Sequence, residues 1–140
     1  MPTSTWSSVA TVTIDENVTD RVFTLGIAEG PQGRGRHLIL QSSLDEPTAQ
    51  DRETRMDSYC IVWGDQHTVY GGVQHVELRS DGRELIMRFS TEAAQELNVQ
   101  GQELRLTLQF PGIYRARLSA ALRRGFRYGN PEHHPTLVGF

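Results

Sequence analysis

Apolar residues alternate with polar ones over much of this chain, and that period of two restricts it to a fold built largely on strands. Such alternation places one face of a strand on a core and the other in water. The runs that begin at Phe23 and at Leu104 are clear examples. The pattern predicts strands over residues 6–14, 21–29, 36–43, 57–63, 69–79, 84–90 and 102–110.

The predicted strand over 69–79 contains an unusual sequence, Tyr70-Gly71-Gly72. Glycine weakens a strand interior, so paired glycines indicate a bulge or a close approach of two backbones. Farther along, Asp81-Gly82 is a strong signal for a tight hairpin. We therefore expect the strands between Tyr59 and Phe89 to form a meander.

Two segments have helical patterns. Ser90 and Thr91 offer N-cap side chains to a short helix that stops before Asn98, and an amphipathic helix is predicted from about Gly112 to Phe126. The predicted fold is α+β, a single domain with a mostly antiparallel β-sheet on which the short helix and the C-terminal helix pack. We place the domain at residues 1–126 and expect residues 127–140 to be a loosely ordered tail.

Charge and cysteine content narrow the functional classes. The 140-residue chain has a formal charge of -3, which argues against nucleic-acid binding and suits a basic partner. The single cysteine, Cys60, excludes an internal disulfide, and we expect a buried, unreactive thiol. The sequence has neither a signal-peptide pattern nor a membrane-spanning apolar run. We therefore expect a cytoplasmic protein that makes no membrane contact.

Signals for catalysis or cofactors are weak. The glycine-rich run at 30–36 precedes a strand, whereas a phosphate cradle normally precedes a helix. The histidines lack zinc-ligand spacing, and neither Asp57-Ser58 nor Asp65-His67 lies in a known nucleophile motif. We predict no enzyme activity, no catalytic residue, no cofactor and no metal.

Four short sequences follow one another in an informative order between about Leu25 and Phe126. They are Leu38-Ile39-Leu40-Gln41, Asp57-Ser58-Tyr59, Tyr70-Gly71-Gly72 and Thr91-Glu92-Ala93-Ala94-Gln95-Glu96-Leu97. In these features the chain resembles the immunity protein 10 family, antitoxins of bacterial polymorphic toxin systems. The resemblance implies that the protein binds the toxin domain encoded beside it and blocks the toxin's active site.

Aromatic residues near the glycine pair have two interpretations. Tyr59 and Trp63 lie on one face of their strand, as expected for a core strand. Alternatively, Trp63 and Tyr70 flank a turn and anchor an interface, because aromatic residues are frequent binding hot spots. We assign a structural role to Tyr59, Gly71 and Gly72, and a candidate partner-binding role to Trp63 and Tyr70.

An acidic segment supplies the other candidate partner-binding residues, which are Asp45, Glu46, Asp51 and Glu53. Such a segment is either a solvated loop or, following the resemblance, a surface that attracts a basic toxin. The leading functional hypothesis is stoichiometric binding of a cognate toxin domain. The alternative is a small-ligand-binding or enzymatic domain with its pocket between the sheet and the C-terminal helix.

Overall fold

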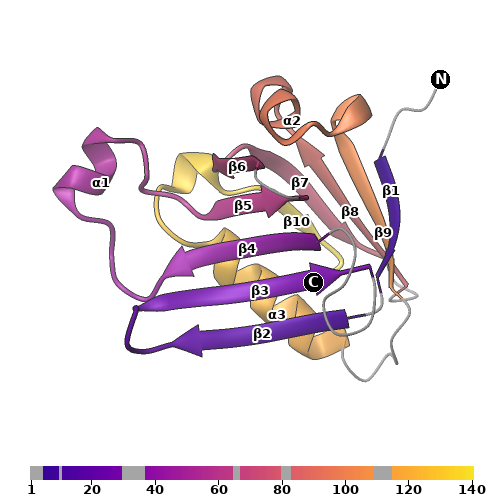
Figure 1. Cartoon of the computed structure of the whole chain (residues 1–140), viewed down its shortest axis with the longest axis horizontal. Coiled ribbons are helices and arrows are strands. Elements are labelled where there is room, and N and C mark those ends of the chain that lie inside the picture. The colour runs from indigo at the N-terminus through magenta and orange to yellow at the C-terminus, as the bar shows by residue number, and fades with distance from the viewer. Residues whose placement is uncertain (1–4, 10, 30–36, 65–66, 80–82, 109–114) are drawn as a thin grey trace.

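The computed structural model describes residues 5–9, 11–29, 37–64, 67–79, 83–108 and 115–140. These residues form an α+β fold with two five-stranded sheets and helices packed against them (Figure 1). The predicted fold class is thereby confirmed. Two predicted features lie outside the described residues: the glycine-rich run at 30–36 and the turn at Asp81-Gly82.

Sheet B has the strand order β2-β3-β4-β5-β6, and each neighbouring pair is antiparallel. Its strands are β2 (Thr11–Asn17), β3 (Val22–Ala28), β4 (His37–Ser43), β5 (Cys60–Trp63) and β6 (His67–Tyr70). In β3 the inward residues Phe23, Leu25 and Ile27 are each at most 2% exposed. The alternation in the sequence therefore corresponds directly to burial.

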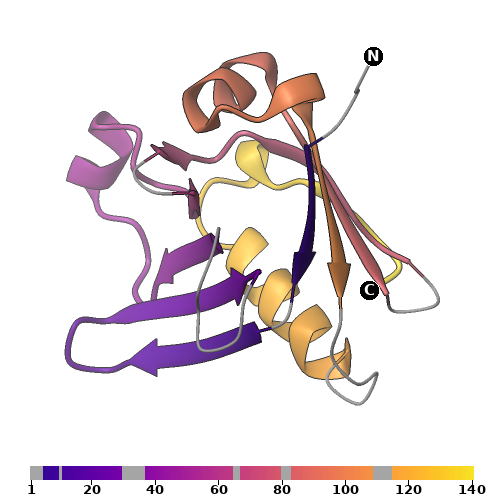
Figure 2. The same ribbon diagram turned by 45° about the vertical axis from the view of Figure 1, so that its right-hand side comes forward.

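Sheet A has the strand order β1-β9-β8-β7-β10. Its strands are β1 (Thr5–Val9), β9 (Glu103–Leu108), β8 (Glu84–Phe89), β7 (Val73–Leu78) and β10 (Thr136–Val138). The pairs β7–β8 and β8–β9 are antiparallel, whereas β1 and β10 add to the two edges in parallel. Figure 2 shows this sheet beside sheet B, with the last strand at its far edge.

Three α-helices connect or cover the sheets in the described part of the chain: α1 (Ala49–Glu53), α2 (Thr91–Leu97) and α3 (Arg115–Phe126). The α2 helix has the predicted caps, because Ser90 Oγ accepts a hydrogen bond from the Ala93 amide at 3.2 Å and Asn98 adopts the left-handed conformation. The α3 helix packs on β3 and β4 (Figure 1). Its side chains Leu118, Leu122 and Phe126 join a core to which both sheets contribute.

The glycine pair divides the predicted strand over 69–79 into two strands. The chain leaves sheet B after Tyr70 and enters sheet A at Val73, so the expected single meander is wrong. Gly71 and Gly72 have φ values of +72° and +86°, a region that side chains rarely adopt. A Cβ on Gly72 would lie 2.6 Å from the Cβ of Ala93 on α2. The two glycines therefore allow the chain to pass from sheet B to sheet A and allow α2 to pack closely against Gly72.

The predicted strand over 6–14 is divided in the same way. Its first part, β1, belongs to sheet A, and its second part, β2, belongs to sheet B. A sheet change cannot be recognised from alternation alone, because both strands continue a period of two.

The segment after α3 contains two elements that its sequence did not indicate. The 3-10 helix η4 (Pro131–His133) is followed by β10, whose residue Leu137 is the register partner of Val76 on β7. Strand β10 is only three residues long, so it offers no periodicity to detect. Its existence depends on a partner strand that lies far away in the sequence.

Candidate partner-binding groove

Two adjacent hollows lie where sheet B meets the loop before α1 and the C-terminal segment. The first has a volume of about 640 Å³ and the second about 470 Å³. Both are lined by Ser43, Asp45 and Tyr128, so they meet at the Tyr128 side chain. We call the two hollows together the Tyr128 groove.

The acidic segment, which we expected to be irregular, contains α1. Thr48 and Asp51 form a capping box in which Thr48 Oγ1 accepts from the Asp51 amide at 3.1 Å and Asp51 Oδ2 accepts from the Thr48 amide at 2.8 Å. The same sequence could have been read as a helix start, because a Thr followed three residues later by an acidic residue is a capping pattern. One carboxylate of the segment thus organises its own backbone.

Asp45 has a structural partner that is distant in the sequence. Arg21 donates to both Asp45 oxygens, at 2.8 and 3.2 Å, and the hydrogen bond lowers the pKa of the Asp45 carboxyl. The Tyr128 hydroxyl donates to the Asp45 carbonyl oxygen at 2.9 Å. Asp45 therefore joins the turn after β2 to the C-terminal segment and forms the wall between the two hollows.

The remaining carboxylates of this region have no arginine partner among the described residues. Glu46 and Asp57 line the first hollow, and Asp51 lines the second. Glu53 lines neither of these two hollows, although it lies on the same helix as Asp51. The groove thus has acidic side chains whose charge is not neutralised by an ion pair within the described structure.

The structure separates the two candidate aromatic anchors. Trp63 is 5% exposed and belongs to the core, whereas Tyr70 is 43% exposed and lines the second hollow. The register pairs Trp63 with His67 and Tyr70 with Cys60. Tyr70 therefore lies at the open end of the β5–β6 hairpin, away from the turn. This position places it beside the acidic segment instead of beside Trp63.

Several groove residues were not identified as candidates from the sequence, among them Met56 and Tyr128. Met56 is 48% exposed and lines the second hollow with Tyr70. Tyr128 lies in the segment for which we expected no regular structure. Burial raises the pKa of its phenol, a hydrogen bond with Ser43 lowers it, and the charges of Asp51, Glu46 and Asp45 raise it further, for a net increase. Only the folded chain brings these carboxylates close to Tyr128.

Tyr59 is fully buried, and its side chain connects sheet B with sheet A and with the C-terminal segment. Its hydroxyl lies 2.8 Å from the His133 carbonyl and 3.3 Å from the Val73 carbonyl, and it accepts from the Val73 amide at 3.1 Å. Its ring meets Phe126 edge-on, with centroids 5.0 Å apart. Burial raises the pKa of the phenol, so Tyr59 is neutral and able to donate at physiological pH.

Ser58 and His133 form a side-chain hydrogen bond at the floor of the second hollow. Such a pair has the composition of a nucleophile and its base. However, Ser58 is only 4% exposed, and it forms a bridge with Gly129. The contact therefore holds the C-terminal segment against residues 57–59.

The alternative hypothesis places a pocket between the sheet and α3, and the described residues of that interface are closely packed. A Cβ on Gly125 would lie 2.5 Å from the Leu40 side chain, and Leu122 and Phe126 are fully buried. These contacts leave little room at this part of the interface, so the alternative is not favoured.

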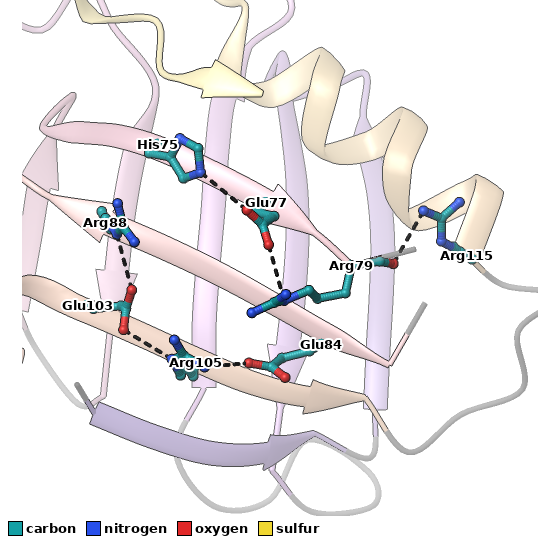
Figure 3. Close-up of polar contacts among 8 residues, drawn as sticks. All are labelled: His75, Glu77, Arg79, Glu84, Arg88, Glu103, Arg105 and Arg115. Carbon is teal, nitrogen blue, oxygen red and sulfur yellow. Dashed lines mark hydrogen bonds and ion pairs between the residues drawn. The ribbon is translucent and has the colours of Figure 1, made fainter. Parts of the chain in front are cut away.

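A second polar cluster lies on the outer face of sheet A, opposite the core side chains (Figure 3). Glu103 accepts from Arg88 at 3.1 Å and from Arg105 at 3.0 Å, and Arg105 also contacts Glu84 at 3.0 Å. Ile86 is only 4% exposed on this face, in register with Glu77 and Arg105. Long charged side chains therefore cover an apolar residue here. We call this cluster the charge ladder.

Within the described ranges, His, Cys, Asp and Glu side chains form no group of three or more that could hold a metal ion. Those ranges also contain no helix that is long and apolar enough to cross a membrane.

An α+β fold with an exposed groove of carboxylate, aromatic and thioether side chains is suited to binding a protein partner. The family comparison agrees with this class, because residues 8–115 match the model of immunity protein 10. The chain belongs to the immunity protein 10 family. No curated protein and no solved structure matches the chain. The family suggests a toxin-neutralising role with a protein partner.

Proposed function

We propose that this protein neutralises a cognate toxin domain by stoichiometric binding through the Tyr128 groove, without catalysis. Its context would be a bacterial polymorphic toxin system, and its site of action the cytoplasm. The observation that carries the proposal is the set of groove carboxylates without an arginine partner in the described structure, in a member of an immunity family.

The groove supports this role through charge and exposed apolar contact area. Toxins that attack nucleic acids have basic clefts, and an acidic surface speeds their encounter and favours the correct orientation. Met56 and Tyr70 are exposed large apolar residues, and such side chains provide anchors at protein interfaces. Of the candidates from the sequence, Asp45, Glu46, Asp51 and Tyr70 line the groove, whereas Glu53 and Trp63 do not.

The first test is co-expression with the toxin domain encoded by the neighbouring gene. We expect the intact protein to restore growth and to form a one-to-one complex measurable by light scattering. Toxicity that persists, with no complex formed, would contradict the proposal.

The second test changes only charge. The combined variant Glu46→Gln, Asp51→Asn and Asp57→Asn should slow association at low salt, while the difference from the unsubstituted protein should shrink as salt rises toward a Debye length of about 8 Å. Asp45 is left intact because Arg21 depends on it. The matched control is the combined variant Asp15→Asn, Glu92→Gln and Glu96→Gln, which removes three charges at exposed positions outside both hollows. Equal association rates for both variants at low salt would exclude steering by the groove.

A further inference from the structure

The second hollow of the Tyr128 groove combines side chains that differ in chemistry. Tyr70 and Tyr128 contribute aromatic rings, Met56 contributes a thioether, and Asp20 and Asp51 contribute carboxylates. Tyr70 and Met56 are exposed by 43% and 48%. An occupant that satisfies all of them needs an apolar stem and a cationic end.

The charge of the second hollow is not balanced by its own described lining. The lining holds three carboxylates, Asp20, Asp45 and Asp51, and one arginine, Arg21. Arg21 donates two hydrogen bonds to Asp45, and neither Asp20 nor Asp51 has an arginine partner among the described residues, so the lining has two more carboxylates than arginines.

Asp51 also retains an open hydrogen-bonding position. Its Oδ2 accepts from the Thr48 amide at 2.8 Å, while Oδ1 has no hydrogen-bond partner among the described residues. A carboxylate accepts at both oxygens. The N-cap therefore fixes the orientation of Asp51 and leaves one of its oxygens for a donor from outside.

Arginine fits this arrangement better than lysine. A guanidinium is planar, stacks on aromatic rings, is weakly hydrated and donates several hydrogen bonds in a fixed geometry, whereas an ammonium is a strongly hydrated point charge. We propose that the second hollow receives an arginine side chain of the partner toxin, which lies against Tyr70 and Tyr128 and donates to Asp51. This inference rests on the proposed function and deepens it.

A matched pair of variants on α1 separates this hollow from general electrostatics. Asp51→Asn removes the charge but keeps a side-chain oxygen for the Thr48 amide, so the helix cap is retained. Glu53→Gln removes the same charge two positions along, outside both hollows. Thermal unfolding of both variants should match that of the unsubstituted protein.

The direct test uses small probes and does not depend on the toxin. The peptide acetyl-Gly-Arg-Gly-amide is titrated into the protein, with ring resonances of Tyr70 and Tyr128 followed by NMR; the lysine and citrulline peptides are the controls. We expect saturable shifts with arginine, weaker ones with lysine and none with citrulline. Asp51→Asn should weaken arginine binding about tenfold, and Glu53→Gln should leave it unchanged. Equal binding of the arginine and lysine peptides, or equal losses in the two variants, would overturn the inference.

A parallel measurement with the neighbouring toxin domain distinguishes the two proposals. If the toxin binds the intact protein and the Asp51→Asn variant equally well, the arginine site is wrong while the immunity function stands. If the toxin does not bind but the arginine peptide does, the immunity function is wrong while the site stands.

Discussion

The charge ladder and the Tyr128 groove contain the same kinds of charged side chain but differ in how these side chains are paired. On sheet A, Glu84 and Glu103 each contact an arginine, and Glu103 contacts two. In the groove, Glu46 and Asp57 have no such partner among the described residues, and Asp51 has one open oxygen. A surface that neutralises itself stabilises the fold, whereas one that retains unbalanced charge is available to a partner.

Strand register explains much of this difference. Arg105 is the register partner of Ile86 and lies beside Glu84 and Glu103, so regular pairing places opposite charges within reach of one another. The carboxylates of the groove lie on loops and on the short helix α1, which impose no such order. Charges there are positioned individually by caps and turns.

The largest effect on stability is expected at Gly72, where the chain passes from sheet B to sheet A. Gly72→Val combines a disfavoured positive φ with a Cβ 2.6 Å from Ala93, and we expect a loss of about 3 kcal/mol or more in the free energy of unfolding. Gly64→Val is the matched control, because Gly64 also has positive φ but has no described atom within 4 Å of an added Cβ. Chemical denaturation measures both variants. Equal losses of unfolding free energy in the two variants would mean that the contact with α2 adds nothing to the cost of Gly72→Val.

A smaller effect is expected from breaking the charge ladder. Glu103→Gln removes the negative charge and one of the two acceptor oxygens that Arg88 and Arg105 contact. Because these arginine side chains are 61% and 35% exposed, solvent screening limits the loss to about 1 kcal/mol. Toxin affinity should not change. Glu84→Gln should cost less, because the ion pair of Glu84 in the described part of the chain is with Arg105 alone. A loss of affinity in Glu103→Gln would contradict the division between the two regions.

The same variant has a defined pH dependence. Burial of Glu103 by itself would raise the pKa of its carboxyl, but hydrogen bonds from Arg105 and Arg88 outweigh burial, and the net pKa is lowered. The stability that the ion pairs add is therefore complete above the unfolded pKa of about 4.3 and is lost as the pH falls through the lower folded value. The free energies of unfolding of the unsubstituted protein and of Glu103→Gln, measured across this pH range, should converge as the pH falls.

The smallest effect concerns Cys60, which lines the second hollow and is the register partner of Tyr70. We expected a buried thiol, and the structure finds it partly exposed. Burial nevertheless raises the pKa of this thiol, so little thiolate is present at neutral pH and labelling should be slow in the native state. Labelling with a chromogenic disulfide should accelerate on denaturation. Rapid labelling of the native protein would indicate that the Cys60 thiol is more accessible from the second hollow than the structure shows.

Elements with local signals were predicted well from the sequence. The α2 helix begins and ends where Ser90 and Asn98 indicate, because caps act on their own neighbours. By contrast, the sheet changes at residues 71–72 and the pairing of β10 with β7 depend on partners elsewhere in the chain. Period and propensity therefore identified strands but not the sheet to which each belongs.

The groove was predicted only in part, for a similar reason. Charge alone pointed to the acidic segment, and its aromatic neighbour Tyr70 was recognised. The pairing of Asp45 with Arg21 and the approach of Tyr128 join residues that are 24 and 83 positions apart. No local pattern could have shown which carboxylates are neutralised. Strand alternation allowed Trp63 to be either a core residue or an interface anchor, and the structure places it in the core.

The family match ends at residue 115, whereas α3 and the segment after it supply both core and groove. Arg127, Tyr128 and Asn130 line the first hollow together with Asp45, Glu46 and Arg52 of the matched region. In the proposed function, the toxin would contact side chains both from the matched region and from the segment that follows it. Under that proposal, substitutions at residues 127–130 would change the preference for a toxin while the strands within the matched region stay the same.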